Sequence, residues 1–335
     1  MASLTRSRLT VTGAALALAF GAANADAATW DMPNEYNPTS IQAQGNKRFA
    51  EVLKEKTNGE IEIVHHFGGS LGYKSQDQFD AVGDGAVPIA DTFIGPLGGF
   101  EPLFLLPSLP FLTANSEESR VLYEVAKPYY ERIFEDNNQK LLFAEPWPPS
   151  GIWAKKPVAG TEDLKNLKIR SYDTSGTITL REAGAAPIQL SWADVVPQLG
   201  TGGIEAVLTS AEGGANAKFW EHLSDFTEIN YAAPLNLVHM NLDVWNELSP
   251  EHQQAVLEAA AEAEAYTWEL AKERVAQNYE EMRGHGMTIT TDVPPEYLEA
   301  LAEASKPALD DWLAKTGEEG RAILEEYRRR TGKEA

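Results

Sequence analysis

The chain has 335 residues, 43% of them hydrophobic, which is enough for one large domain or two medium ones with a buried core. It contains no cysteine, which excludes a disulfide framework and a thiolate metal site. Its formal net charge of −22 disfavours nucleic acids and anionic membrane surfaces as partners, because binding to phosphates needs clustered lysine and arginine.

Residues 1–27 have the pattern of a cleaved secretory signal peptide. Arg6 and Arg8 precede a short apolar run at 9–20, and small residues typical of a cleavage site follow at 23–27. The apolar run is shorter than the roughly 20 residues that a membrane-spanning helix needs. We therefore expect an exported protein, and the lack of cysteine in a chain of this size suits a bacterial periplasm.

Strands and helices alternate at the start of the predicted mature chain. Apolar alternation predicts strands at 28–33, 61–67 and 86–94, and helical periodicity predicts helices at 40–59 and 75–85. In the first of these helices, Ser40 is the expected N-cap and Gly59 the stop. This β, α, β, α, β order favours a mostly parallel sheet covered by helices.

A second series of the same kind follows a proline-rich crossing. After a helix at 116–137, the stretch 140–158 reads as a long strand interrupted by Pro146, Pro148 and Pro149, which suits a passage between two lobes. The later strands and helices are expected at 167–173, 175–184, 186–191, 192–202 and 204–210. We infer a second α/β lobe.

The segment from Ser249 to Gly284 predicts one long helix, with Pro250 at a position that helices accept at their start. At about 1.5 Å per residue it would reach about 50 Å, so we expect it to lie across both lobes, with a coiled coil as the alternative. Two or three further helices are expected at 294–330. The predicted division is a signal peptide at 1–27, a first lobe at 28–148 and 236–276, and a second lobe at 149–235 and 277–335.

The mature chain resembles the periplasmic solute-binding proteins of tripartite ATP-independent periplasmic (TRAP) transporters, the DctP family. The resemblance is carried by residues 164–210 and 239–263, with weaker support from 68–92 and 107–112. It implies a two-lobed α/β fold, similar to that of periplasmic binding proteins, hinged by strands and one long helix that spans both lobes. It also implies a periplasmic receptor rather than an enzyme, and some family members recruit a cation beside the ligand carboxylate. We expect a monomer without cofactor or metal. The implied partners are a small solute and the small and large membrane subunits of a TRAP permease.

Arg170 is the leading candidate for ligand binding. In the family that the chain resembles, an arginine placed as Arg170 is usually paired with the ligand carboxylate. A guanidinium is a planar, two-pronged donor that matches a carboxylate, and a closed cleft excludes the water that would weaken the pair. The alternative is a structural arginine paired with Asp173 or Glu145.

Other contacts implied by the resemblance transfer less directly. Thr209 stands where many members have an asparagine, and its hydroxyl can still donate to a carboxylate. Ser150 and Trp153 lie near the place of a second arginine in many members, and the lack of that cation argues against a dicarboxylate. Phe93 occupies a wall position of the first lobe. With the further aromatic candidates, it indicates a monocarboxylate with a compact or aromatic body. Those candidates are Trp192, Trp147, Phe219 and Trp220.

Loops at the carboxyl ends of strands in the first lobe supply the remaining candidates, because ligands of open α/β sheets bind there. They are Asn34, Glu35 and Tyr36 after the first strand, and Asp91 near the end of the third. Acidic candidates, with Asp173 among them, also support an alternative ligand, a small amine or zwitterion such as an ectoine-like solute or an amino alcohol.

A secreted serine hydrolase is a distant alternative. The sequence at 68–72 matches G-x-S-x-G with Ser70 as nucleophile, and His239 or His285 would be the base. His65 and His66 are adjacent on a predicted strand and point to opposite faces, so we expect no metal site there.

Overall fold

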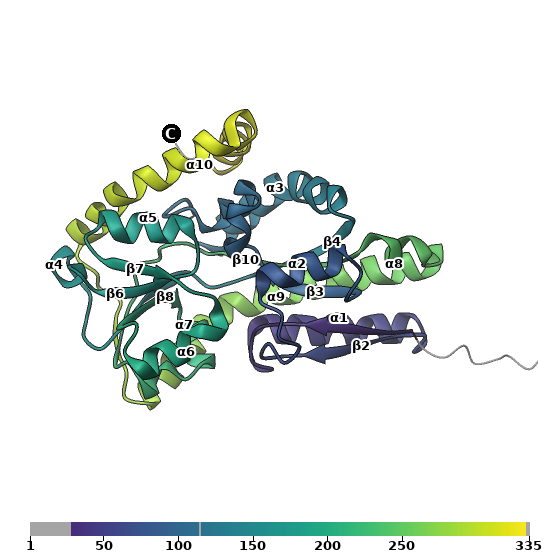
Figure 1. The fold of residues 1–335 in the computed structure, drawn as a ribbon, viewed down its shortest axis with the longest axis horizontal. Coiled ribbons are helices and arrows are strands. Elements are labelled where there is room, and N and C mark those ends of the chain that lie inside the picture. Colours follow the sequence, from purple (N-terminus) through teal and green to yellow (C-terminus); the bar gives the residue numbers. More distant parts are fainter. Residues whose placement is uncertain (1–27, 114, 333–335) are drawn as a thin grey trace, which may run out of the picture.

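The computed structural model describes residues 28–113 and 115–332, and their helices and strands gather into two lobes (Figure 1). The first lobe contains a parallel pair, β1 (Ala28–Pro33) with β2 (Ile61–His66). Beside it, a three-stranded sheet has the order β3-β10-β4. Its strands are β3 (Ile89–Phe93), β4 (Gln139–Pro146) and β10 (Leu235–Asn241).

The second lobe is built on a six-stranded sheet of order β11-β9-β5-β8-β6-β7. Its strands are β5 (Ser150–Ala154), β6 (Lys168–Ser171), β7 (Ala186–Gln189), β8 (Ala206–Ser210), β9 (Asp225–Thr227) and β11 (Thr288–Thr290). The two-lobed α/β fold predicted from the sequence is confirmed, whereas the predicted lobe boundaries stay a prediction.

The expectation of mostly parallel sheets is wrong at two strands. In the first lobe β10 runs antiparallel to both β3 and β4, and in the second lobe β5 runs antiparallel to both β8 and β9. Both strands follow a passage of the chain from the other lobe, so neither belongs to a βαβ unit that would force it to be parallel. These two passages bring the lobes together around residues 147–149 and 228–234.

The helices cover the sheets and begin where their caps predict. In α1 (Ile41–Lys56) the Ser40 side chain accepts a hydrogen bond from the Ala43 amide, and Gly59 follows the helix with a positive φ of 80°. The other helices apart from the two longest are α2 (Ser75–Gly83), α3 (Ser116–Asp136), α4 (Thr161–Leu164), α5 (Thr174–Glu182), α6 (Trp192–Thr201), α7 (Ala211–Asn216) and α8 (Leu242–Glu247). Short 3-10 helices are η1 (Gly95–Gly99), η2 (Pro102–Ser108) and η3 (Phe219–Glu221).

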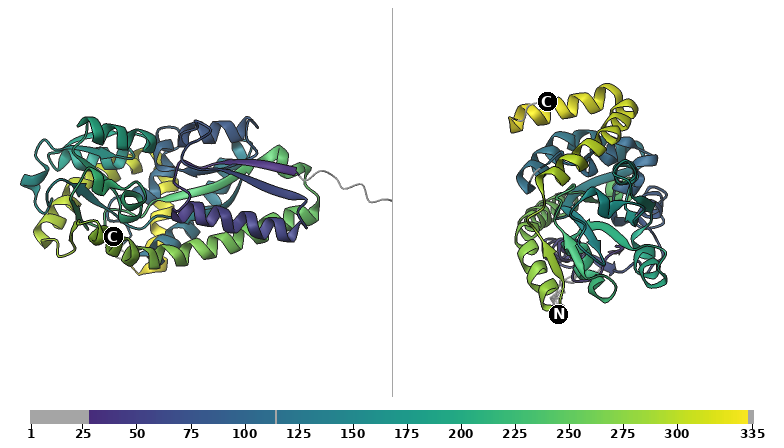
Figure 2. Two further views of the ribbon diagram at one scale, coloured as in Figure 1. Left: turned by 90° about the horizontal axis from the view of Figure 1, so that it is seen from below. Right: turned by 90° about the vertical axis from the view of Figure 1, so that its left-hand side faces the viewer.

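Two long helices connect the lobes. Helix α9 (Pro250–Gly284) is capped by Ser249 and runs beside α1 in the first lobe, then reaches α7 and β11 in the second (Figure 2). The expected helix across both lobes is therefore confirmed. Helix α10 (Pro295–Thr331) packs on α5 and on α3, and the non-helical Gly317 divides it in two. The tail thus forms two helices, as expected.

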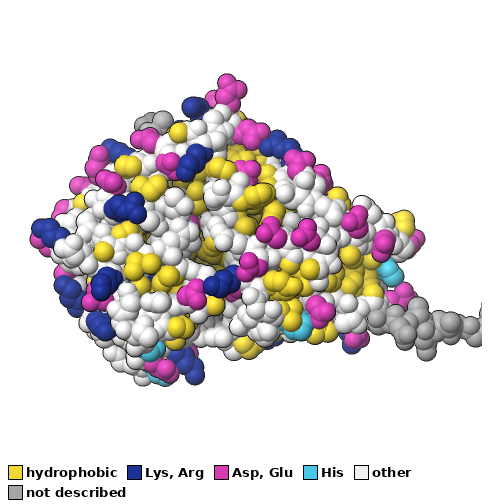
Figure 3. All heavy atoms as spheres, viewed as in Figure 1, with side chains coloured by type: hydrophobic (Ala, Val, Ile, Leu, Met, Phe, Trp, Pro, Cys, Tyr) yellow, Lys and Arg dark blue, Asp and Glu magenta, His cyan; other side chains and the backbone are white. Residues whose placement is uncertain are grey.

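The surface agrees with the acidic composition. On the face shown in Figure 3, lysine and arginine side chains are scattered among aspartate and glutamate rather than gathered in one patch. Within residues 28–113 and 115–332, no helix combines the length and the apolar character needed to cross a bilayer. The predicted signal peptide lies outside the described residues.

Candidate ligand-binding site

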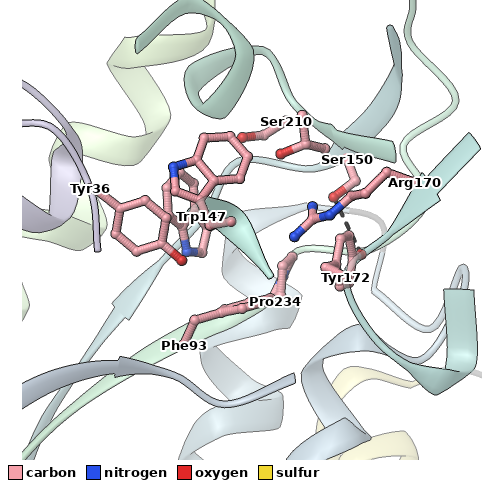
Figure 4. Close-up of a pocket in the computed structure, with 10 residues that line it drawn as sticks. Tyr36, Phe93, Trp147, Ser150, Arg170, Tyr172, Ser210 and Pro234 are labelled. Atoms are coloured by element: carbon pink, nitrogen blue, oxygen red, sulfur yellow. Dashed lines mark hydrogen bonds between the residues drawn. The ribbon is translucent and has the colours of Figure 1, made fainter. Parts of the chain in front are cut away.

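A pocket lies where the two lobes meet (Figure 4). Its empty volume, counting the part open to solvent, is about 330 Å³. First-lobe residues reach it from strand ends, because Tyr36 follows β1, Phe93 ends β3 and Pro234 precedes β10. Ten residues line it: Tyr36, Phe93, Trp147, Ser150, Arg170, Tyr172, Trp192, Thr209, Ser210 and Pro234. Residues from both lobes therefore enclose one small space.

Arg170 is the charged group of this pocket, and its side chain is anchored without an acid. It stands on β6 and is 3% exposed. Its Nε donates to the carbonyl of Leu190 at 3.0 Å and its Nη1 to the carbonyl of Leu208 at 3.4 Å. In the described part of the chain no acidic group lies within the 4.0 Å of an ion pair, so the structural pairing with Asp173 or Glu145 is not found.

The guanidinium is therefore a buried cation, and some of its N–H donors have no acceptor among the described residues. It points into the pocket in Figure 4, and its Nη2 has no protein acceptor among the described residues. Burial lowers the pKa of Arg170 to about 10, so it still carries its charge at neutral pH. A buried charge is costly unless it is paired, so this geometry favours an anion in the pocket.

Aromatic rings form most of the remaining wall. The rings of Tyr36 and Trp147 meet edge to face with centroids 4.7 Å apart, and Trp192 lies 5.8 Å from Tyr36. Phe93 and Tyr172 also meet edge to face at 5.6 Å. Arg170 lies over the rings of Tyr172 and Trp192, with its Cζ 5.7 and 5.6 Å from their centroids, so a cationic end of the pocket adjoins a largely aromatic wall.

Hydroxyl groups supply the polar contacts that remain. The Thr209 hydroxyl on β8 lines the pocket and makes no hydrogen bond within the described residues. Ser150 Oγ lies 3.4 Å from Tyr172 Oη, while Ser210 Oγ accepts a hydrogen bond from the Gly213 amide and so caps α7. The hydroxyl of Thr209 and the phenol of Tyr36, which also makes no hydrogen bond among the described residues, are consequently available to a ligand.

A second cavity, with an empty volume of about 680 Å³ counting the part open to solvent, adjoins the first and is lined by residues at the starts of α2 and α6. The two cavities share Phe93, Arg170, Tyr172 and Trp192, and the second adds Glu35. The Glu35 carboxylate accepts a hydrogen bond from the Ser75 hydroxyl, and burial raises its pKa. Arg170 thus stands at the junction of an aromatic inner pocket and a more polar outer one.

The model of the bacterial extracellular solute-binding proteins of family 7, DctP, matches residues 33–316. The chain belongs to this family. It is a solute receptor of the TRAP type, whose members bind small molecules and work with membrane permease components.

Solved structures similar to the receptor include two that hold the same ligand. One is a TRAP solute-binding protein from a marine metagenome, specific for pyroglutamate, with 32% identity and a TM-score of 0.87, covering 91% of this chain and 99% of its own. Another is an extracytoplasmic solute receptor of Bordetella pertussis that binds pyroglutamic acid, with 29% identity and a TM-score of 0.86, covering 90% and 100%.

Among curated relatives, the 2,3-diketo-L-gulonate-binding periplasmic protein of Escherichia coli is 26% identical over 87% of this chain and 88% of its own. The relatives named as periplasmic indicate the compartment in which this receptor class works.

The structure brings most of the predicted residues of the receptor together. Six of them line the inner pocket, and Glu35 lines the outer one. The six are Arg170, Thr209, Phe93, Ser150, Tyr36 and Trp192. Because they come from both lobes, they meet only in the folded chain. Their contacts with a ligand stay a prediction.

Four predicted residues lie elsewhere. Trp153 is buried in the core of the second lobe, where its Nε1 donates to the Ser210 carbonyl at 3.1 Å and its ring packs against Phe226. Asp173 caps α5 by accepting a hydrogen bond from the Gly176 amide at 2.8 Å. Asn34 and Asp91 are buried behind the pocket and bond to each other. None of these four residues lines either cavity, so the geometry of the pocket gives no support to their predicted contact with a ligand.

The pocket also contains four residues outside the predicted set. Trp147 is one of several further aromatic candidates in the sequence, and no local pattern predicts a ligand contact for Ser210 or Pro234. Tyr172 could have been found, because it stands two residues after Arg170 and side chains two apart on a strand share a face.

The hydrolase alternative has no assembled site. Ser70 lies in the turn after β2, while the buried His239 is 2.8 Å from the Thr92 hydroxyl through its Nε2. No histidine bonds to Ser70 among the described residues. The G-x-S-x-G pattern is explained by a glycine-rich turn in which Gly68, Gly69 and Gly72 have positive φ.

Proposed function

We propose that the receptor binds a small organic monocarboxylate between its lobes and delivers it to a TRAP membrane permease, without a chemical step. One observation carries the proposal. The Arg170 guanidinium is buried, lacks an acidic partner in the described chain and points into a pocket. A ligand carboxylate would provide the paired, bidentate acceptor that this cation lacks.

The charge of the pocket supports a single carboxylate. Arg170 is the one charged side chain among the described residues that line the inner pocket. The next cation, Lys74, lines the outer cavity and is paired with Asp194 at 2.9 Å. A second carboxylate in the inner pocket would therefore lose its hydration without gaining a counter-charge.

The walls support a compact, ring-shaped body, and we propose a pyroglutamate-like acid. Two similar receptors, at 32% and 29% identity, bind pyroglutamate. The edge-to-face pairs Tyr36–Trp147 and Phe93–Tyr172 form apolar walls of the pocket, which suit a small ring. Polar atoms of a lactam would find the Thr209 hydroxyl and the phenol of Tyr36 within the same lining.

A zwitterion is the second candidate, and Glu35 is the observation that favours it. Its carboxyl lines the outer cavity and has one buried oxygen, Oε1, without a hydrogen-bond donor. A curated relative from Halomonas elongata, 23% identical, is named an ectoine-binding protein. However, burial raises the pKa of Glu35, which weakens it as a counter-charge for an ammonium. The acid therefore remains the first proposal.

Three related compounds separate these candidates. L-pyroglutamate has the ring, the lactam and the carboxylate, 2-pyrrolidinone lacks the carboxylate, and L-proline has an ammonium in place of the lactam. In thermal-shift and calorimetric titrations of residues 28–335, we expect L-pyroglutamate to raise Tm because a ligand of the folded state stabilises it. We expect no shift with 2-pyrrolidinone.

The outcomes are distinguishable. Binding of 2-pyrrolidinone as tight as that of L-pyroglutamate would overturn the carboxylate proposal. Tighter binding of L-proline or ectoine would select the zwitterion. If another monocarboxylate binds in place of L-pyroglutamate, the acid class stands and the proposed ring is wrong.

A further inference from the structure

Asp91 is buried behind the pocket and accepts three hydrogen bonds from asparagine side chains. It stands on β3, is 1% exposed and does not line either cavity. Its Oδ2 accepts from Asn34 Nδ2 at 2.6 Å and from Asn46 Nδ2 at 2.8 Å. Its Oδ1 accepts from Asn236 Nδ2 at 2.7 Å. One carboxylate therefore gathers amide groups from three separate segments of the first lobe.

Two of these asparagines also accept a hydrogen bond from a residue of the aromatic wall of the pocket. Asn34 Oδ1 accepts the backbone N–H of Tyr36 at 2.6 Å, and Asn236 Oδ1 accepts the indole Nε1–H of Trp147 at 2.8 Å. Tyr36 and Trp147 form the edge-to-face pair of the pocket. The third asparagine, Asn46 on α1, makes no such contact with the wall. Its buried Oδ1 has no hydrogen-bond partner.

A carboxylate at the centre of this network sets the direction of each amide. An ionised carboxylate only accepts hydrogen bonds, so each asparagine must turn its NH₂ toward Asp91 and its carbonyl oxygen away. For Asn34 and Asn236 that oxygen then meets the N–H of a wall residue. A neutral group with both a donor and an acceptor would not impose this orientation.

We propose that Asp91 is a positioning residue that holds the Tyr36 and Trp147 walls through Asn34 and Asn236, and so sets the affinity and selectivity of the pocket. Its effect on ligand binding rests on the proposed function, whereas its effect on the wall does not. Asp91 does not contact the ligand in this proposal, whereas Arg170 does.

The chain offers a matched control for this proposal. Asn46 and Asn236 are both fully buried and both donate to Asp91, at 2.8 and 2.7 Å, but only Asn236 contacts a wall residue. Asn46→Ala and Asn236→Ala therefore each remove one buried hydrogen bond to Asp91, and only Asn236→Ala also removes the acceptor of the Trp147 indole N–H. If the network is merely structural, the two variants should behave alike in every measurement.

The first readout is affinity for L-pyroglutamate by calorimetry. We expect Asn236→Ala to weaken binding at least tenfold and Asn46→Ala less than threefold, while both lower Tm. We also expect Asn236→Ala to lower the ratio of the affinity for L-pyroglutamate to the affinity for L-proline. Equal losses in the two variants, or an unchanged affinity in Asn236→Ala, would overturn the inference.

The second readout needs no ligand. In protein labelled with 5-fluorotryptophan, the fluorine resonance of Trp147 is assigned by its absence in Trp147→Phe. We expect Asn236→Ala and Asp91→Asn to shift or broaden this resonance and Asn46→Ala to leave it in place. An unmoved resonance contradicts the positioning role, even if Asp91→Asn fails to fold, because Asn236→Ala tests it separately. A moved resonance in a receptor that does not bind L-pyroglutamate leaves the positioning role intact and rejects only the proposed ligand.

Discussion

The ammonium of Lys74 lies 2.9 Å from the carboxylate of Asp194, and this ion pair joins α2 of the first lobe to α6 of the second. Lys74 lines the outer cavity, as does Ser191, whose hydroxyl also donates to Asp194. The pair therefore lies at the edge of the outer cavity, which adjoins the inner pocket. The ion pair can form only when the two lobes are close together, so its attraction stabilises the closed arrangement of the lobes.

We predict that Lys74→Met lowers ligand affinity two- to fivefold, mainly through faster dissociation. Both side chains are about half exposed, and such pairs contribute only about 0.2–1 kcal/mol. Stopped-flow dissociation at low salt and in 1 M NaCl checks this, because salt should weaken the wild type more than the variant. Lys156→Met is the control, since Lys156 pairs with Asp163 within one lobe at 3.0 Å. An equal effect of both variants would contradict a role in closure.

The contact between α1, β4 and α9 depends on a glycine. A Cβ built on Gly45 would lie 1.9 Å from Glu145 Oε1 and 2.3 Å from Thr267 Cγ2. We predict that Gly45→Ala lowers the free energy of unfolding by about 1–3 kcal/mol, as overpacking does. Gly200→Ala is the control, because its Cβ meets only His222 Cε1 at 4.0 Å and alanine is the better helix former. Urea denaturation of both variants is the measurement, and an unchanged Gly45→Ala midpoint would contradict the packing argument.

A buried acid pair should make stability depend on pH. Burial raises the pKa of Asp91 to about 6, and burial together with the Asp91 charge raises the pKa of Glu145. The folded state therefore binds more protons than the unfolded chain once the pH exceeds about 4. Stability from this pair is highest at acid pH and falls as the pH rises through about 6.

We predict that Glu145→Gln raises Tm at pH 7.5 by a few degrees and has little effect at pH 4.5. A glutamine keeps a donor toward Asp91 and removes the cost of ionising a fully buried group. Melting curves of both proteins from pH 4 to 8 check the prediction. A variant that is less stable than the wild type at pH 7.5 would show that the ionised pair is favourable.

Much of the fold follows from local signals. The caps Ser40 and Ser249 and the long polar segment up to Gly284 identify α1 and α9 within a few residues, because these signals act between neighbours in the chain. The strand β10 was not predicted. Strand β10 is antiparallel to its neighbours because the chain enters it from the second lobe, and no local sequence pattern predicts that path.

The site divides in the same way. Arg170 could be placed from its strand, but the role of Asp91 could not, because its partners Asn34 and Asn236 are 57 and 145 residues away. From the sequence alone, an acidic residue at the carboxyl end of a strand could either contact the ligand or hold the residues of the pocket wall from behind. Trp153 stands three residues after Ser150 on β5, so the two side chains point to opposite faces of the sheet and only Ser150 lines the pocket.

The affinity of Arg170→Ala for the monocarboxylate that stabilises the wild type most, L-pyroglutamate by our proposal, tests the central claim most directly. Calorimetry should show a loss of at least about 100-fold, because the ligand carboxylate would lose its partner in a dry site. Arg181→Ala, which removes an exposed arginine of α5, should bind as the wild type does. An Arg170→Ala receptor that binds within threefold of the wild type would contradict the account.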